Sequence, residues 1–384
     1  MSTRFRLSAP RHSYFDEPIT VELERSGVPV SGPFSLREKP SGRLIPAQLK
    51  WVTDETVAIC FIVDRLARGE SVEFELVENE CTVEGVEVIP SGEQAVAFHI
   101  RGSLFTAYHW DSESARPFLY PVIGPGGGCV TRHFPMVKDI PGETTDHKHH
   151  RSIWVAHGDV NGVDNWTEEP GHGTIKHKLF LEQTSGPVFA RVVALNDWLD
   201  NSDRKVMEEE REITVYNICD SACVLDMRVA FKATEGDVRF GDTKEGGICS
   251  VRVATTMDGN KGGVITNSYG AITEAETWGK RAHWCDYSGP VGDRVVGIAI
   301  FDHPSNFRYP TYWHVRDYGL MTANPFALSA YKNDRSLDGS HLVRQGSMFA
   351  FAYRIYIHDG DVSAGRVSEK YHGYINPPLI ESGK

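Results

Sequence analysis

The sequence predicts an all-β protein, because hydrophobic residues alternate with polar residues along several segments. Residues 19–23, 72–76 and 349–357 show this period of two, which is typical of strands with one buried face. Clusters of Gly, Pro, Asn and Asp separate such segments, where an α/β protein would have helices of about 10–15 residues. We therefore expect antiparallel sheets rather than βαβ units.

The remaining elements follow from shorter patterns. Further strands are predicted at residues 57–63, 96–100, 188–193, 213–216, 224–231, 248–254 and 295–301. One helix is expected from Val362 to Lys370, with Asp361 as its amino-terminal cap and Gly373 as its end. The turn-rich stretch at residues 90–93 predicts a domain boundary. We expect a small β-sandwich accessory domain over residues 1–93 and a larger β domain over residues 94–384.

Composition excludes several classes of partner. The 384 residues carry 40 Lys and Arg against 52 Asp and Glu, a net charge of −12, so the basic excess of a nucleic-acid-binding protein is missing. The apolar runs are too short to span a bilayer, and the first residues do not resemble a signal peptide. Seven cysteines without a CxxC pair indicate reduced thiols. We expect a cytoplasmic protein that binds neither nucleic acid nor membranes; the oligomeric state stays open.

Histidine is concentrated in one part of the chain, since seven of the 16 histidines lie within residues 133–177. The densest segment contains His147, His149 and His150, followed by Arg151. In an extended chain, His147 and His149 share one face, as in a metal-binding pair or a two-imidazole acid/base site. An exposed loop with packed imidazoles would show the same pattern.

Turn residues follow this cluster and carry many hydrogen-bonding groups. His157, Asp159 and Asn161 lie in this segment, and Trp166 stands beside two glutamates. A sugar ring can stack on such an indole while its hydroxyl groups bind the neighbouring carboxylates and amides. Alternatively, Trp166 fills the edge of the sandwich.

Two later segments add candidates for acid/base chemistry. Lys244 and Glu245 stand between glycines before the strand at 248–254, where a neighbouring charge and partial burial would shift their pKa values. A charged turn is the alternative interpretation. Aromatic and charged residues combine again near residue 314, and the candidates there are His314, Arg316, Asp317 and Tyr318.

Familiar cofactor motifs are absent from the sequence. The glycines at residues 124–128 do not form GxGxxG, and there is no Walker loop, HExxH or GxSxG. We therefore expect no NAD or nucleotide. A divalent metal stays open as a cofactor, with His147 and His149 as candidate ligands, completed by His157 or His314 and by Glu245.

Taken together, these segments resemble a bacterial family labelled methane oxygenase PmoA. The resemblance covers most of residues 100–375, and its blocks in order are Tyr120-Pro121, Thr131-Arg132, 146–152, 157–162, 242–247, 286–290, 301–304 and 314–319. Lys148 departs from the family, which usually has Pro there. The chain is also similar to aldose-epimerase-like proteins, which implies a galactose-mutarotase-like supersandwich. Sugar would then bind a concave sheet face between a histidine and a carboxylate. The family's association with sugar oxidoreductases implies a 3-keto glycoside as substrate.

These expectations lead to one main hypothesis and two alternatives. The main hypothesis is an enzyme of carbohydrate catabolism that acts on a sugar or 3-keto glycoside as a lyase, hydrolase or epimerase. Its predicted catalytic residues are His147, His149, His150, Lys244, Glu245, His314 and Asp317. Its predicted substrate-binding residues are Arg151, His157, Asp159, Asn161, Trp166, Arg316 and Tyr318. The alternatives are a non-catalytic carbohydrate-binding protein and a metal-dependent oxygenase, as the family label suggests.

Overall fold

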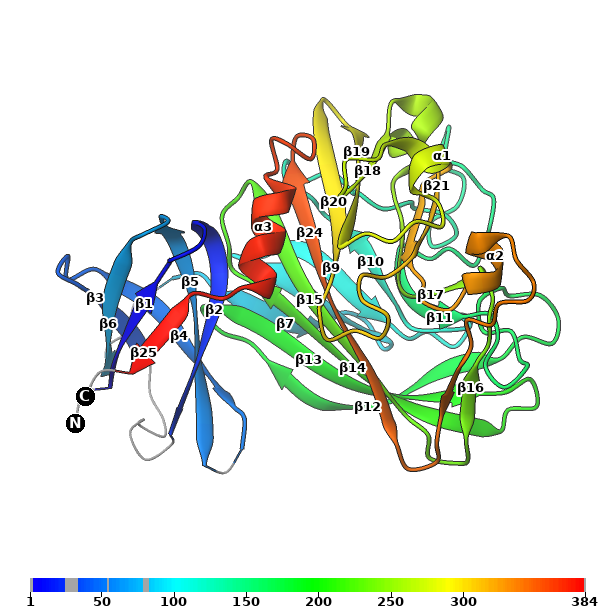
Figure 1. Ribbon diagram of the computed structural model, residues 1–384, viewed down its shortest axis with the longest axis horizontal. Helices are drawn as coiled ribbons and strands as arrows, with labels where there is room; N and C mark the ends of the chain where they lie inside the picture. Colours follow the sequence, from blue (N-terminus) through cyan, green and yellow to red (C-terminus); the bar gives the residue numbers. More distant parts are fainter. Residues whose placement is uncertain (1–2, 25–33, 54, 79–82, 383–384) are drawn as a thin grey trace.

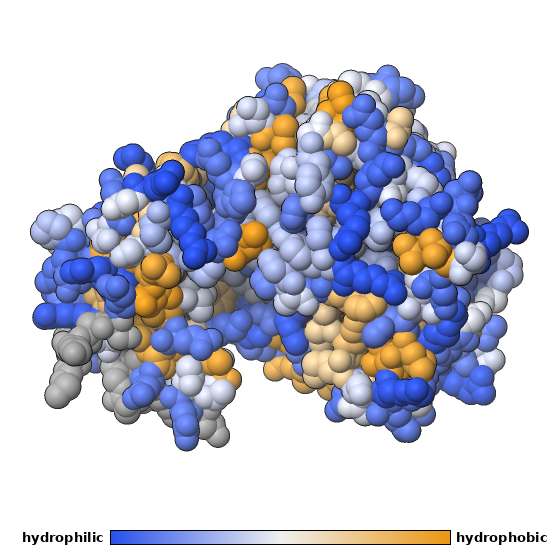
Figure 2. Space-filling view, in the orientation of Figure 1, coloured by the Kyte–Doolittle hydropathy of each residue, from blue (hydrophilic) through white to orange (hydrophobic). Residues whose placement is uncertain are grey.

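A computed structural model of the chain describes residues 3–24, 34–53, 55–78 and 83–382. The regular structure of these residues consists of 25 strands and a few short helices, which confirms the all-β prediction. Figure 1 shows the strands in two adjoining β units, a smaller one in blue and a larger one. On the side seen in Figure 2 the surface is mostly hydrophilic, and hydrophobic residues are exposed in small patches.

The smaller unit, which we call the N-terminal unit, is a seven-stranded antiparallel sheet folded around its own core. In spatial order its strands are β2 (Tyr14–Glu24), β5 (Thr56–Leu66), β4 (Leu44–Trp51), β3 (Phe34–Lys39), β6 (Ser71–Glu78), β1 (Arg4–Ser8) and β25 (Leu379–Ser382). Phe5, Phe61 and Phe74 meet at its centre, with the rings of Phe61 and Phe74 5.3 Å apart. Phe5 alternates with the exposed Arg4 and Arg6 along β1, the pattern of a half-buried strand, whereas Phe61 lies in a run of buried residues on β5.

The larger unit, the large domain, contains two eight-stranded antiparallel sheets. Sheet 2 contains, in spatial order, β21 (Trp313–Arg316), β22 (Leu320–Ala323), β17 (Gly246–Arg252), β11 (Ile153–His157), β10 (Phe118–Val122), β9 (Ser103–His109), β8 (Ala95–Ile100) and β7 (Val86–Pro90). Sheet 3 contains β12 (Thr174–Thr184), β13 (Phe189–Leu199), β14 (Lys205–Tyr216), β15 (Ala222–Lys232), β24 (Met348–Asp359), β20 (Arg294–Asp302), β19 (Trp284–Val291) and β18 (Val264–Asn267). A small ribbon pairs β16 (Val238–Phe240) with β23 (His341–Val343).

The main hydrophobic core lies between sheets 2 and 3. Ile153 and Val155 of β11 and Ile355 and Ile357 of β24 belong to this core. Figure 1 shows the pale cyan strands β9 and β10 of sheet 2 behind the strands of sheet 3. Each such side chain contributes roughly 1.5–3 kcal/mol when it leaves water. Two large packed sheets confirm the predicted supersandwich.

The sheets divide the chain differently from the predicted boundary near residue 93. β7 precedes that boundary but pairs with β8 in sheet 2, and residues 91–94 form the hairpin turn between them, closed by a hydrogen bond from Ser91 N to Ala95 O (2.9 Å). β25 returns to the N-terminal unit and pairs with β1. A hairpin turn and a linker between domains have the same turn-forming residues, so the sequence could not distinguish a hairpin at residues 91–94 from a domain boundary.

Helices are few and short, and one of them was predicted from the sequence. They are α1 (Thr273–Thr277), α2 (Leu328–Lys332), α3 (Val367–Ile375) and the 3₁₀ turns η2 (Thr255–Met257) and η3 (Gly259–Lys261). The predicted helix begins at Val367 rather than Val362, because Asp361 caps a separate turn and Arg366 adopts a left-handed φ of 53°. No helix in the described part of the chain is long and apolar enough to cross a membrane.

The cysteines that the structure describes are free thiols. Cys60, Cys249 and Cys285 are buried, whereas Cys129, Cys219 and Cys223 are half-buried; Cys81 lies outside the described residues. Burial raises the pKa of the Cys249 thiol, which keeps it protonated and unreactive at neutral pH. This agrees with the prediction of reduced thiols.

Candidate functional site

The face of sheet 2 that points away from the main core carries a continuous row of side chains. Residues directly opposite each other on paired strands share a face. The pairing places side by side, from β9 to β21, His109, Phe118, Trp154, Ser250, Thr322 and His314. The rings of His109 and Phe118 stack at 5.2 Å, and the hydroxyl groups of Ser250 and Thr322 are 2.7 Å apart. We call these six residues the floor row.

The predicted histidines come together above this row. His150 stacks on Trp154 (5.2 Å between ring centroids), His147 stacks on His150 (4.8 Å), and Tyr318 stacks on His147 (4.9 Å). His149 meets His150 edge to face at 4.5 Å. We call His147, His149 and His150 the histidine cluster.

The backbone of the cluster differs from the extended chain assumed in the sequence analysis. His147 has a left-handed φ of 41°, and the backbone amide of His150 donates to the carbonyl oxygen of His147 at 2.9 Å. The segment is therefore a turn, so His147 and His149 are brought together by the turn and not by strand alternation. Asp146 accepts a hydrogen bond from Nδ1 of His147 at 3.1 Å.

Three arginines with side chains at most 1% exposed hold this turn from below. Arg132 and Arg252 both donate to Oδ1 of Asp146, and Arg132 also donates to the carbonyl oxygen atoms of His147 (2.9 Å) and His150 (3.2 Å). Arg116 donates to the carbonyl of His149 at 3.2 Å. Buried charges need such partners, so these arginines fix the position of the cluster.

The buried arginines also set the charge state of their partners. Burial opposes ionisation of Asp146, but the hydrogen bond from His147 and the charges of Arg252 and Arg132 outweigh it and lower its pKa. Nη1 of Arg252 lies 3.2 Å from Nδ1 of His150. Because a guanidinium only donates, Nδ1 accepts and the proton of His150 sits on Nε2. Burial holds the pKa of His150 well below its usual range, so it is a neutral, fixed imidazole.

Glu245 and His314 reach the same region from two other segments. Glu245 directly precedes β17 and pairs with Lys244, and both side chains are about two-fifths exposed (41% and 42%). His314 lies on β21, and its Nδ1 is 2.6 Å from the carbonyl oxygen of Lys244. Because a carbonyl only accepts, Nδ1 carries the proton. The Nε2 atom is therefore an acceptor, and it is buried without a hydrogen-bond partner among the described residues.

Electrostatics link the three segments. Burial, followed by the charge of Arg116, lowers the pKa of His149 to about 4, and burial lowers that of His314 to about 4. Burial works against ionisation of Glu245, yet the hydrogen bond and charge of Lys244, together with His314 and His149, lower its pKa. At neutral pH the site therefore presents two uncharged imidazoles and a carboxylate within electrostatic range of one another.

Tyr318 and two arginines complete the surroundings. Burial raises the pKa of Tyr318 to about 12, so its hydroxyl group stays protonated, and Arg252 lies over its ring at 4.9 Å. Arg316 pairs with Glu274 and lies over the ring of Trp278 at 5.6 Å. Arg151 makes two hydrogen bonds of 3.1 Å to Glu168.

Other predicted site residues support loops instead. His157 is fully buried and its Nε2 is 2.9 Å from the carbonyl oxygen of Gly241. Gly158 N donates to Glu245 O at 2.7 Å, an approach that only glycine allows, since a Cβ would lie 2.3 Å from that oxygen. Asp159 accepts from the amide of Gly162 (2.9 Å).

Three further predicted residues also have structural surroundings. Asn161 accepts from the amide of Arg239 (2.7 Å), which ties its turn to β16. Asp317 binds the start of α1 through the amide of Glu274 (3.2 Å). Trp166 is fully buried and packs beside Trp154 and the cluster, so it offers no exposed surface to a sugar and fills the interior instead.

The histidine cluster does not suit a metal ion. Among the described residues no group of three or more His, Cys, Asp or Glu side chains is arranged to hold a metal. Nδ1 of His147 is engaged by Asp146 and Nδ1 of His150 by Arg252. The positive charges of Arg132 and Arg252 directly beneath the cluster would repel a cation.

Sequence reasoning missed several residues that build the site. These are Arg116, Asp146, Trp154, Glu168, Ser250, Arg252 and Thr322. Arg252 stood in a predicted hydrophobic strand, and a charge within such a run is a usable signal because its burial demands a partner. Asp146 lies in a block of the family resemblance and Glu168 is one of the two glutamates beside Trp166, whereas Arg116, Trp154, Ser250 and Thr322 carry no comparable signal.

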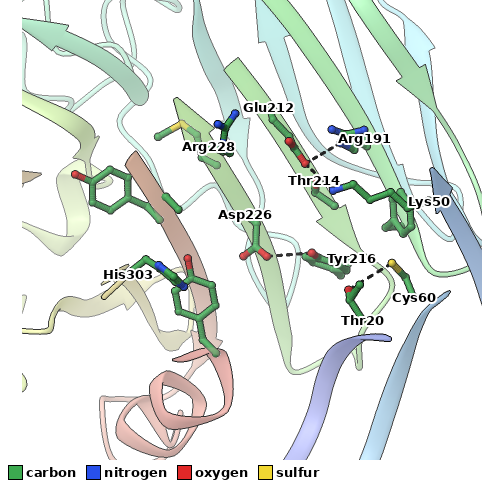
Figure 3. A pocket seen from close by; sticks show the side chains of 15 residues that line it. Thr20, Lys50, Cys60, Arg191, Glu212, Thr214, Tyr216, Asp226, Arg228 and His303 are labelled. Carbon is green, nitrogen blue, oxygen red and sulfur yellow. Dashed lines mark hydrogen bonds and ion pairs between the residues drawn. The ribbon is translucent and has the colours of Figure 1, made fainter. Parts of the chain in front are cut away.

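A second polar cavity lies between sheet 3 and the N-terminal unit (Figure 3) and has a volume of about 220 Å³. Its charged groups satisfy one another. Glu212 accepts from Arg191 (2.7 Å) and from Lys50 (3.1 Å), and Tyr216 donates to Asp226 (3.0 Å). Such mutual pairing is typical of an interface between domains, so sheet 2 carries the better candidate site.

Comparison with known proteins adds a family. A model of a family of unknown function, DUF6807, matches residues 95–372. The chain belongs to the DUF6807 family. No curated protein matches this DUF6807 chain. Among solved structures, 37 chains match. One is a protein in glycosyl hydrolase family 38 from Enterococcus faecalis, with a TM-score of 0.44 and 12% identity; the match covers 100% of this chain and 47% of that one. The DUF6807 chain thus spans about half the length of that protein.

Proposed function

We propose that this DUF6807 protein is an enzyme of carbohydrate catabolism that moves protons on a sugar or 3-keto glycoside, as a lyase, hydrolase or epimerase. The observation that carries the proposal is the convergence of His149, Glu245 and His314 from three separate segments onto one face of sheet 2. Two uncharged imidazoles, a carboxylate and a protonated tyrosine suit acid/base chemistry better than binding alone.

The proposed reaction begins with removal of a proton. A keto group at C3 of the sugar acidifies the proton at C2, and His149, uncharged at neutral pH, accepts it. The electron pair moves into an enolate, whose oxygen accepts a hydrogen bond from the hydroxyl group of Tyr318. The enolate then expels the oxygen at C1 with its electron pair, and a C1–C2 double bond remains. The ammonium group of Lys244, oriented by Glu245, protonates the departing oxygen.

The other cluster residues act on these groups. His314 donates to the carbonyl of Lys244 and so positions the segment that contains Lys244 and Glu245. His150 is buried between Trp154 and His147, with its Nδ1 bound by Arg252, and acts as a positioning residue. Addition of water to the double bond would complete a hydrolysis. In an epimerisation the enolate would keep its oxygen at C1, and a proton would return to the other face of C2.

The resemblance to the family labelled methane oxygenase PmoA and to aldose-epimerase-like proteins supports the same substrate class. In addition, exposed parts of His147, Lys244 and Glu245 offer donors and acceptors to hydroxyl groups. A non-catalytic carbohydrate-binding protein would use the same surface and is the second candidate.

Nuclear magnetic resonance in deuterated water tests the proposal. The protein is incubated with glycosides and their 3-keto derivatives, with and without EDTA. We expect deuterium at C2 or loss of the C1 substituent, at the same rate in both arms. Broadened ligand signals without turnover would favour the binding protein, and loss of activity in EDTA would favour a metal. Substrate-dependent consumption of oxygen would favour the oxygenase.

The pH profile of turnover is a separate prediction. Because burial and Arg116 lower the pKa of His149 to about 4, the base stays unprotonated until the solution is strongly acidic. We expect kcat/KM to stay level from about pH 7 to about pH 5 and to fall as the pH drops through about 4. A decline centred near pH 6.5, where an unburied imidazole titrates, would contradict a base whose pKa burial has lowered.

A further inference from the structure

A large cavity adjoins the histidine cluster. It has a volume of about 790 Å³ and is lined by residues that include His109, Phe118, Tyr120, Lys148 and Arg151. Lys148 and Arg151 belong to the same segment as the cluster, and His109 and Phe118 are two members of the floor row. The cavity therefore opens onto the same face of sheet 2 as the site and continues it toward β9.

Its volume exceeds what a small leaving group needs. Pockets of about 300–1,000 Å³ hold ligands of drug size, so this cavity has room for a further ring. Phe134, Pro135 and Met136 provide an apolar wall, whereas Asp111 and Glu113 provide carboxylates. An apolar wall beside polar groups suits a pyranose ring, which has a C–H face and a rim of hydroxyl groups.

The lining closest to the cluster is rigid. Arg151 is held by two hydrogen bonds to Glu168 and lies over the ring of Phe118 at 5.8 Å. Glu168 also lies within electrostatic range of His149. The hydroxyl group of Tyr120 is fixed 2.7 Å from Nδ1 of His133. One face of the cavity is thus ordered before a ligand arrives, which lowers the entropic cost of binding.

We propose that this cavity is the binding position for the group released from C1 and that this group is itself a sugar ring. The inference rests on the proposed function and narrows it: the substrate is a disaccharide or a longer glycoside rather than a simple alkyl glycoside. The sugar that reacts lies against the histidine cluster, and its neighbour lies between Arg151 and the apolar wall. Tyr120, which lies in one block of the family resemblance, lines the position of the neighbouring sugar.

A blocking variant tests the inference. Met136→Trp places an indole at the half-buried wall of the cavity. Two substrates are compared, the 3-keto derivative of a glucose disaccharide and the 3-keto derivative of methyl glucoside. We expect kcat/KM for the disaccharide derivative, divided by kcat/KM for the methyl derivative, to fall at least tenfold. Met348→Trp is the matched control, because Met348 is 63% exposed and lies outside the cavity, and it leaves the ratio unchanged. An unchanged ratio in Met136→Trp would overturn the inference.

The failure of the inference can be told apart from failure of the proposed function. If the unaltered protein turns over neither substrate, the proposed function fails, and binding of the disaccharide by calorimetry then tests the cavity alone. Met136→Trp should weaken that binding at least tenfold, and Met348→Trp should not. Equal affinity of both variants for the disaccharide would remove the cavity as a sugar position.

Discussion

Replacing His149 by Gln should lower turnover of a 3-keto glycoside by roughly 100- to 10,000-fold, the contribution of a general base. The amide keeps the size and polarity of the imidazole but cannot accept the C2 proton. His149 is only half-buried, and its backbone carbonyl, which binds Arg116, is unaffected by the change. We therefore expect the melting temperature to change little. Turnover by NMR and differential scanning calorimetry measure the two quantities.

A matched histidine separates this effect from a general loss of stability. His172 is also half-buried, and its Nδ1 contacts the carbonyl oxygen of Gly173 at 2.7 Å instead of a residue of the cluster. His172→Gln should keep full activity. If His149→Gln loses stability and activity together, His149 is a packing residue and the base must be sought elsewhere.

The sequence predicted which residue types form the site, but not how they are arranged in space. The local excess of histidine and the Lys244-Glu245 pair marked residues that the structure does bring together. Their meeting depends on β21, β22, β17 and β11 lying side by side in this order in sheet 2, a long-range pairing that no local pattern encodes. The turn at His147 depends on Arg132 and Arg252, which lie far apart in the sequence.

The fold shows the same division between local and long-range information. Alternation and short apolar runs predicted ten of the 25 described strands, because burial of one or both faces leaves its trace in those segments. Trp166 was ambiguous, because an indole beside carboxylates fits both a binding surface and a buried corner. The sequence could not predict that β7 joins sheet 2 or that β25 lies beside β1. Both positions depend on which strands pair, and the residues of a single strand do not specify its partner.

The strongest effect on stability is expected at a charged pair inside the main core. Glu209 and Arg211 lie on the inward face of β14, with side chains 0% and 3% exposed. Glu209 accepts from Arg211 (2.6 Å), from the indole N–H of Trp198 (2.6 Å) and from Asn196 (3.1 Å). Arg211 also donates to the carbonyl of Pro117 (3.1 Å). In the sequence, residues 208–212 are all charged and are typical of an exposed strand. Glu209 and Arg211 can be buried only because these hydrogen-bond partners surround them.

Glu209→Ala should therefore lower the free energy of unfolding by about 3–5 kcal/mol, because the guanidinium of Arg211 stays buried without its counter-charge. Glu210→Ala is the matched control. This substitution removes the carboxylate of the next residue along β14, which pairs with Arg228; the two side chains are 42% and 41% exposed. It should change the free energy of unfolding by less than about 1 kcal/mol. Urea unfolding followed by tryptophan fluorescence measures both. Equal effects of the two variants would mean that water reaches Arg211, and that the core between sheets 2 and 3 opens at β14.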